Sequence, residues 1–141
     1  MAAMLEKNKK QIRGACRYQM AVPVKYLRKV LGPELAPLVA EAAGQAAIAV
    51  EGELVECSVE PNLVVMVVEL PGHVAPNDFV RTFRQVSKAA VLEADPTVAT
   101  RIPNLWTQTW LVETMGQGIG ADELDDYLSK VRTSQRTEGL G

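Results

Sequence analysis

The imidazole and thiol side chains that could bind a metal ion are few in this chain: one histidine and two cysteines. The one histidine, His73, follows a Pro-Gly pair in a turn-like stretch. A single imidazole without nearby carboxylate or thiolate partners makes a poor metal site. We therefore expect His73 to be a solvated loop residue. Asp78 fits better as a capping residue of a helix that begins at Pro76, since its side chain can accept from free backbone amides.

The two cysteines, Cys16 and Cys57, are far apart and lack a Cys-x-x-Cys spacing. That pattern favours reduced thiols in the cytoplasm over a disulfide. The first ten residues lack the apolar centre of a signal peptide, and no segment approaches the ~18 apolar residues of a membrane span. With 141 residues, of which 48% are apolar, we expect one domain with an ordinary core and no membrane partner.

Basic side chains are concentrated at the start of the chain. The net charge of −2 by itself argues against a strong nucleic-acid binder. However, residues 1–30 hold eight basic residues against one acidic residue, whereas residues 31–60 hold six glutamates and no basic residue. A basic arm and the group Lys25, Arg28 and Lys29 could follow a phosphate backbone with salt-sensitive affinity.

A second basic group could extend that surface. Arg81, Arg84 and Lys88 are spaced by three and four residues, so they would share one face of a helix. The alternative for both groups is a solvated terminus and an amphipathic helix with its charges facing water.

Hydrophobic patterning predicts the order β-α-β-β-α-β-α. Alternating or β-branched runs predict strands, while Pro and Asp-Pro mark helix boundaries. The predicted strands cover 15–24, 53–60, 63–70 and 105–115, and the helices run from Gly32-Pro33 to Ala49, over 76–94, and onward from a cap at Asp122. Residues 97–104 are expected to be a connection and 116–120 a glycine hinge. This order predicts an α+β fold: a ferredoxin-like or RNA-recognition-like antiparallel sheet with helices packed on its faces.

Trp106 and Trp110 lie four residues apart in the last predicted strand, so they would point to the same face. We expect them to belong to the core or to a dimer interface. Stacking on bases, as in single-strand binders, is the alternative.

Several segments are informative when taken in chain order: Pro23–Leu31, Pro61–Val68, Glu69–Val80, Leu105-Trp106, Val112–Gly116 and the helix that carries Tyr127. Together they resemble the single-tyrosine HUH-nuclease transposases of small insertion sequences, including the REP-associated tyrosine transposases. The resemblance runs from about Tyr18 to about Val131. Pro23–Leu31 resembles the family's Pro-Lys-Tyr-Arg-Arg-Lys-Val-Leu segment, with one residue inserted near Val24 and Leu27 in place of an Arg.

The resemblance implies that the catalytic metal site has been lost. Two family histidines that hold the metal fall on Leu63 and Val65, and a third ligand, a Gln, corresponds to Val131. A nuclease of this kind needs a divalent cation to stabilise charge on the phosphate, and none of these three side chains can ligate one. We therefore expect a degenerate member of the family with no metal and no cofactor.

Tyr127 corresponds to the family's nucleophile, whose hydroxyl attacks a DNA phosphate to form a covalent 5′-phosphotyrosine. Basic residues commonly precede it in the family, whereas Asp125 and Asp126 do so here. Two carboxylates at this place would repel a phosphodiester. We expect Tyr127 to be a vestigial nucleophile that packs against the sheet beside Leu124 and Leu128.

The resemblance also implies a homodimer in which the two sheets join edge to edge and the tyrosine helix of one subunit completes the other's site. We therefore expect a transposase-like protein, inactive as a nuclease, that binds single-stranded or hairpin DNA. The expected domain covers 15–132, between a basic arm over 1–14 and a flexible tail over 133–141. Two alternatives stay open: a dimeric interaction or scaffold protein without DNA binding, and an active transposase that uses Tyr127.

Overall fold

The computed structural model describes residues 14–116 and 119–140, with side chains as far as Val131. The elements, in chain order, are β1 (Ala15–Pro23), the short helix η1 (Lys25–Leu27), α2 (Ala36–Ala49), β2 (Glu53–Glu60), β3 (Leu63–Pro71), α3 (Pro76–Ala94), α4 (Val98–Arg101), β4 (Leu111–Met115) and α5 (Ala121–Leu140).

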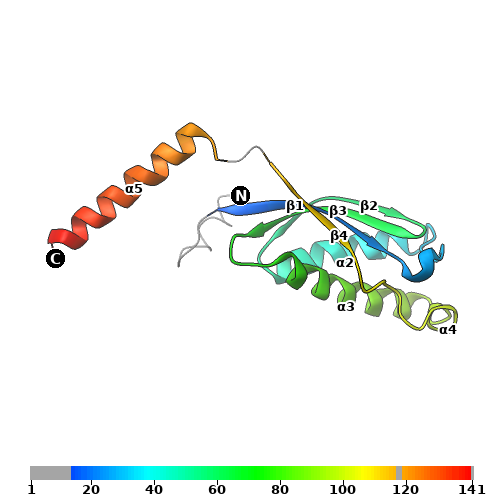
Figure 1. Ribbon diagram of the computed structural model, residues 1–141. Helices are drawn as coiled ribbons and strands as arrows, with labels where there is room; N and C mark the ends of the chain where they lie inside the picture. Colours follow the sequence, from blue (N-terminus) through cyan, green and yellow to red (C-terminus); the bar gives the residue numbers. More distant parts are fainter. Residues whose placement is uncertain (1–13, 117–118, 141) are drawn as a thin grey trace.

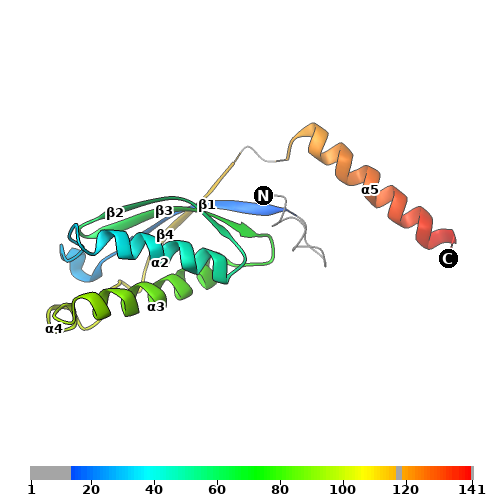
Figure 2. The same ribbon diagram turned by 180° about the vertical axis from the view of Figure 1, so that it is seen from behind.

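The four strands form one antiparallel sheet in the order β2-β3-β1-β4. Helices α2 and α3 lie side by side under one face of this sheet, and the opposite face carries no described helix (Figures 1 and 2). The predicted α+β antiparallel architecture is confirmed. Along the inner strand β3, Val64, Met66, Val68 and Leu70 alternate, are all fully buried and belong to the core on the side of the helices.

Ser87 forms buried polar contacts in the core between helices and sheet, near Trp106. The Trp106 ring lies 5.3 Å from the Phe83 ring, centroid to centroid. Its Nε1 donates to Ser87 Oγ at 3.0 Å, and Ser87 Oγ donates to the carbonyl of Phe83 at 2.6 Å. Trp106 is therefore a core residue, as expected, and Trp110 packs against the core as well.

The starts of α2 and β4 differ from the prediction. Helix α2 begins at Ala36, not at Gly32-Pro33, because the Gly32 carbonyl accepts from the amides of Leu35 and Ala36 in a turn that precedes the helix. Strand β4 begins at Leu111, not at residue 105. The two tryptophans thus lie outside β4, and the prediction that they share one face of this strand is wrong.

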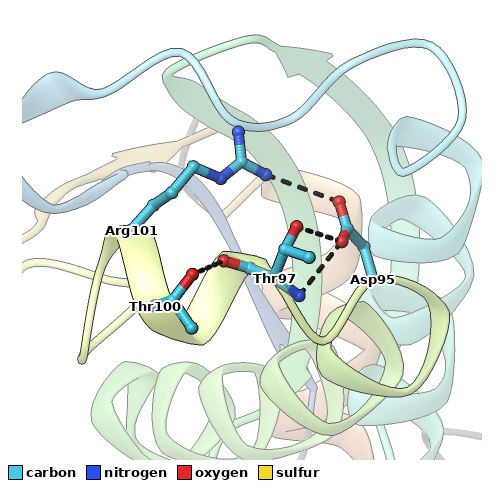
Figure 3. Close-up of polar contacts among 4 residues, drawn as sticks. All are labelled: Asp95, Thr97, Thr100 and Arg101. Atoms are coloured by element: carbon cyan, nitrogen blue, oxygen red, sulfur yellow. Dashed lines mark hydrogen bonds and ion pairs between the residues drawn. The ribbon is translucent and has the colours of Figure 1, made fainter.

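The connection after α3 contains a short helix that the sequence analysis missed. The predicted stop at Asp95-Pro96 is confirmed, since α3 ends at Ala94. Asp95 accepts hydrogen bonds from the amide and hydroxyl of Thr97, at 3.1 and 2.5 Å, and lies 3.4 Å from Arg101 (Figure 3). Thr100 Oγ1 donates to the Thr97 carbonyl at 2.6 Å, so the turn and helix α4 form one hydrogen-bonded unit.

Helix α5 projects away from the sheet (Figures 1 and 2). Tyr127 on it is 48% exposed, so the expected packing of Tyr127 against the sheet of its own chain is wrong. The helix continues to Leu140, past the boundary expected at 133, and Asp122 lies inside its first turn rather than before it. The expected basic arm, apart from Gly14, lies outside the described residues, as do 117–118 of the expected glycine hinge.

No helix among the described residues is long and apolar enough to cross a membrane.

Candidate functional site

The face of the sheet opposite α2 and α3, here called the open face, carries two positions at which the resemblance places metal ligands. Because side chains alternate along a strand, Leu63 and Val65 point to the open face while Val64 and Met66 point into the core. Leu63 and Val65 are half-buried, and Val67, the next residue on this face, is only 5% exposed. The open face of β3 is therefore apolar where it would have to be polar to hold a metal.

A shallow hollow of about 210 Å³ lies on the open face beside Val65. Its lining consists of Gln19, Met20, Ala21, Val65, Leu111 and Glu113. Of these, only Gln19 and Glu113 offer side-chain oxygens, so the hollow supplies a single carboxylate, far short of the oxygen ligands of a Ca²⁺ site. No group of three His, Cys, Asp or Glu side chains placed to hold a metal ion occurs among the described residues. The residues of this hollow thus do not fit a resident divalent cation.

An ion pair lies further along the open face, beyond Val67. Glu69 is 6% exposed, and its Oε2 lies 3.2 Å from Arg17 Nη2 on the neighbouring strand β1. The negative charge of this buried carboxylate is already balanced by the arginine. We therefore assign this pair to the sheet rather than to a binding site.

Helix α5 carries the remaining positions of the expected site. Leu124, Tyr127, Leu128 and Val131 share one helix face by their spacing, and the three that precede Val131 are exposed. Asp126, beside Tyr127, lies 3.1 Å from Lys130. Because α5 points away from the sheet, one chain does not bring Tyr127 and Val131 to Leu63 and Val65 (Figure 1).

The first basic group lies in the loop after β1. The Val24 amide donates to Asn62 O at 2.9 Å and the Leu31 amide to Pro61 O at 3.0 Å, so this loop borders the end of β3 where Leu63 lies. Arg28 and Lys29 are exposed. Within residues 14–116 and 119–131, Lys25, Arg28 and Lys29 form no ion pair. Their charges are available to an anionic ligand.

The second basic group, on α3, has other partners. Arg81 is exposed and lies 3.7 Å from Asp78, and Lys88 is exposed. Arg84 is half-buried, and its Nη2 donates to the carbonyls of Thr107 and Gln108 at 2.6 and 2.9 Å. Burial lowers the pKa of the Arg84 guanidinium below its usual value. Arg84 therefore holds the segment before β4 in place.

Arg84 links the second basic group to the segment beside the first. Its acceptor Thr107 donates its own amide to Pro23 O at 3.1 Å, and the Lys25 amide donates to Leu105 O at 2.9 Å, so one backbone segment separates Arg84 from the loop that carries Lys25. Helix α3 also covers the face of the sheet that α2 covers (Figures 1 and 2). Only the first group borders the open face.

The sequence profile of the family described as "Transposase IS200 like" matches residues 13–130. The chain belongs to this family. The IS200-like transposase fold also appears in solved structures of similar shape. One is the crystal structure of a protein assigned as a transposase, from Deinococcus radiodurans R1, with a TM-score of 0.67 and 22% identity over 86% of this chain and 96% of that one.

Another similar structure is a REP-associated tyrosine transposase bound to a REP hairpin. Its TM-score is 0.56 and its identity 14%, over 87% of this chain and 66% of that one. At these identities the structures establish the fold of this IS200-like transposase and nothing finer. No curated protein matches the chain.

Sequence reasoning missed one feature of this IS200-like transposase, the backbone of the first basic loop. Tyr26 and Leu27 both have positive φ, 59° and 52°, and both side chains are exposed. The available signal was the pair of large apolar residues among Lys25, Arg28 and Lys29. Nothing in hydrophobic periodicity predicts left-handed backbone at residues other than glycine.

Proposed function

We propose that this IS200-like transposase is inactive as a nuclease and binds single-stranded or hairpin DNA as a dimer in the cytoplasm. The observation that carries the proposal is the open face of β3, where Leu63 and Val65 occupy the ligand positions and offer hydrocarbon. Without a divalent cation, a tyrosine hydroxyl lacks the charge stabilisation that phosphodiester cleavage needs. Tyr127 is then a vestigial nucleophile, accompanied by Asp125 and Asp126.

Retained DNA binding is supported by the first basic group. Lys25, Arg28 and Lys29 are without ion-pair partners in the described part of the chain and border the open face. Such cations bind a phosphate backbone by releasing counterions. Arg81 and Lys88, exposed on α3, form a second and weaker contact zone for DNA. Arg84 is half-buried and bound to backbone carbonyls, so it contributes less to this zone. The similar fold of a REP-associated transposase bound to a REP hairpin supports a hairpin as the DNA form.

Dimerisation is supported by an apolar helix face and by one sheet edge. Helix α5 exposes Leu124, Tyr127 and Leu128, which a second copy would cover. Pairing of a second sheet with the edge strand β2 is disfavoured, because charges and bulges at an edge oppose such pairing. Strand β2 carries Glu53, Glu56 and Glu60 and has an irregularity between Leu54 and Glu56. The other edge strand, β4, carries Glu113 as its one charged residue and is better suited to pair with a second sheet.

Fluorescence anisotropy with a labelled DNA hairpin, a single strand and a duplex tests the proposal across a salt titration. We expect the hairpin and single strand to bind more tightly than the duplex, with affinity falling steeply as salt rises. A Lys25→Gln, Arg28→Gln, Lys29→Gln triple variant should reduce the slope of log affinity against log salt by about 2, since each phosphate contact on a single strand adds about 0.7. Absence of binding by the unchanged protein at low salt would remove the DNA-binding function.

Nuclease inactivity has its own assay. After incubation with the hairpin and Mg²⁺ or Mn²⁺, we expect no covalent protein–DNA adduct in denaturing gels. A metal-dependent adduct that disappears in Tyr127→Phe would contradict the proposal and establish an active transposase. A Tyr127→Phe variant that binds hairpin DNA as the unchanged protein does would agree with a vestigial role.

The second candidate function is a dimeric scaffold or interaction protein that does not bind DNA. It is favoured by the engagement of Arg84 with backbone carbonyls and by the carboxylates Asp122, Glu123, Asp125 and Asp126 in the first turns of α5. A dimer in sedimentation that fails to bind any of the three DNA forms would support this candidate.

A further inference from the structure

The loop after β1 presents an aromatic side chain on a disfavoured backbone. Tyr26 has φ 59° and ψ 17°, and Leu27 has φ 52°. Left-handed conformations crowd the Cβ of an L-residue, and such strain gathers at ligand sites. Glu51, the other described non-glycine residue of positive φ, follows the C-cap residue Val50 of α2, a place where that conformation is common. The Tyr26-Leu27 pair has no such explanation.

The strain is imposed by contacts on both sides of the pair. Before it, the amides of Val24 and Lys25 donate to Asn62 O and Leu105 O, each at 2.9 Å. After it, Val30 and Leu31 are buried in the core. Within the loop, the Leu27 amide donates to Val24 O at 2.8 Å. The chain is thus held at both ends while the two side chains between them project into solvent.

The exposure of these side chains is large for their type. Tyr26 is 74% exposed and Leu27 is 59% exposed. Lys25 Nζ lies 5.5 Å from the centre of the Tyr26 ring, and Arg28 and Lys29 follow directly. This exposed ring lies among cations that have no ion-pair partner in the described part of the chain. Such an arrangement suits a nucleotide, whose base can lie on the ring while its phosphates meet the cations.

We propose that Tyr26 is the stacking platform for one unpaired base of the bound DNA, and that Lys25, Arg28 and Lys29 hold the adjoining phosphates. Base pairs within a duplex are already stacked on both sides, so the ring selects a single-stranded or unpaired nucleotide. The loop borders the Leu63 end of β3, which places this base at the margin of the open face. This inference rests on the proposed DNA binding and adds to it a residue that distinguishes an unpaired base from a duplex.

The test measures anisotropy with two labelled hairpins, one with a single-stranded flank and one blunt. Tyr26→Ala should weaken binding of the flanked hairpin about five- to 150-fold, the range of one base–aromatic stack, and leave the salt slope unchanged. Tyr26→Phe keeps the ring and should bind within about twofold of the unchanged protein. Leu27→Ala, the matched control on the next strained residue, should also bind within about twofold.

A Tyr26→Gly variant separates binding from folding. Glycine adopts positive φ without a Cβ clash, so this variant should unfold at an equal or higher urea concentration than the unchanged protein. It should nevertheless lose as much affinity as Tyr26→Ala. With 2-aminopurine in the flank, the unchanged protein should quench its fluorescence by stacking and both ring-less variants should not.

The outcomes separate the two proposals. If the unchanged protein binds neither hairpin, the proposed DNA binding fails and this inference fails with it. If it binds the flanked hairpin and Tyr26→Ala binds equally well, the stacking platform is overturned while DNA binding stands. If Tyr26→Ala and Leu27→Ala leave DNA affinity unchanged and both weaken the dimer in sedimentation, the loop is a protein contact and the inference is overturned.

Discussion

Replacing Leu63 and Val65 by histidine tests how much of a metal site the open face of the sheet still supports. The two positions are two residues apart on β3 and on the same face, about 7 Å from Cα to Cα. We expect the double variant to bind Ni²⁺ at least about tenfold more tightly than Leu63→His alone, because imidazole is a good Ni²⁺ ligand and two can chelate one ion. Calorimetric titration measures both affinities. Equal affinities would mean that the strand does not place the two side chains together.

The contact between Ser87 and Trp106 makes a prediction about stability. Ser87→Ala removes the acceptor of the buried indole N–H, which Ser87 Oγ meets at 3.0 Å. A buried donor without a partner costs about 1–3 kcal/mol, so urea unfolding should show a loss of free energy of about that size. Ser58→Ala, on the exposed side of β2, should change it by less than about 0.5 kcal/mol. Similar losses in both variants would contradict the role of the indole contact.

At the scale of residues, sequence reasoning succeeded where a side chain's neighbours are close in sequence. His73 is exposed and both cysteines are free, as expected, and Asp78 accepts from the Ala75 amide at the start of α3. The role of Arg84 could not be predicted in this way. Its spacing from Arg81 and Lys88 predicts a shared basic face, yet its guanidinium is bound to backbone carbonyls. Its partners, Thr107 and Gln108, lie more than twenty residues away, and helical periodicity contains no information about them.

Among the elements, the turn from α2 into β2 depends on Gly52. An added Cβ there would lie 2.6 Å from Glu69 O and 2.8 Å from Leu70 Cδ2. We expect Gly52→Ala to lower the free energy of unfolding by about 1–3 kcal/mol, as overpacking usually does. Gly44→Ala is the matched control, since nothing lies within 4 Å of its added Cβ. Because Gly44 is inside α2, that change should stabilise by up to about 1 kcal/mol. Urea unfolding compares the two, and equal effects would contradict the close approach.

The turn between α3 and α4 predicts a pH dependence (Figure 3). The hydrogen bond from Thr97 Oγ1 lowers the pKa of Asp95 most; desolvation opposes it, and the Thr97 amide and Arg101 assist it. A carboxyl whose pKa is lower in the folded protein stabilises the fold above its unfolded pKa of about 3.9, and that stability disappears as pH falls through the folded pKa. Thr97→Val should therefore lower the urea midpoint at pH 7.

The difference between Thr97→Val and the unchanged protein should shrink as the pH falls below the pKa of Asp95, because both proteins then carry a protonated Asp95. Thr100→Val is the control, since Thr100 Oγ1 donates to a backbone carbonyl and to no titrating group in the contacts of Figure 3. Thr100→Val should change the urea midpoint by the same amount at pH 7 and at a pH below the pKa of Asp95. A Thr97→Val effect that is independent of pH would contradict the role of Asp95.

Proline marked the boundaries of α3 correctly, whereas Pro33 did not mark the start of α2, which begins at Ala36. Helix α3 runs over Pro76–Ala94 as predicted, because Pro suits a first turn and Asp95-Pro96 stops the helix. The start of β4 could not be predicted, since residues 105–110 have the composition of a strand. Trp106 forms one isolated bridge with Val24. The carbonyls of Thr107 and Gln108 are then bound to Arg84, so the chain leaves the ladder before β4 begins at Leu111. Helix α5 was predicted, but its position away from the sheet was not. Its apolar residues Leu124, Tyr127 and Leu128 are exposed in the single chain, and helical periodicity does not show what covers them.

For the molecule as a whole, the departure of α5 predicts a dimer that depends on its apolar face. We expect the protein to sediment as a dimer, and a Leu124→Ala, Leu128→Ala double variant to raise the dissociation constant at least about tenfold. Each truncation removes about 2 kcal/mol of apolar burial from the interface, and every 1.4 kcal/mol is about tenfold in affinity. Alanine is the best helix former, so α5 itself should persist, which far-ultraviolet circular dichroism can check.

Asp122→Ala with Asp125→Ala is the matched control, because these carboxylates share the other side of α5 and their removal leaves the apolar face intact. This control should dimerise as the unchanged protein does, or slightly better as like charges are removed. If the leucine variant stays as dimeric as the control, the interface does not involve α5, and pairing of the two β4 edges would have to hold the dimer alone. Glu113→Pro at that edge would then dissociate it, since proline cannot donate to a sheet ladder. A monomer in all of these proteins would leave α5 uncovered and would contradict a dimeric function, whether or not DNA binds.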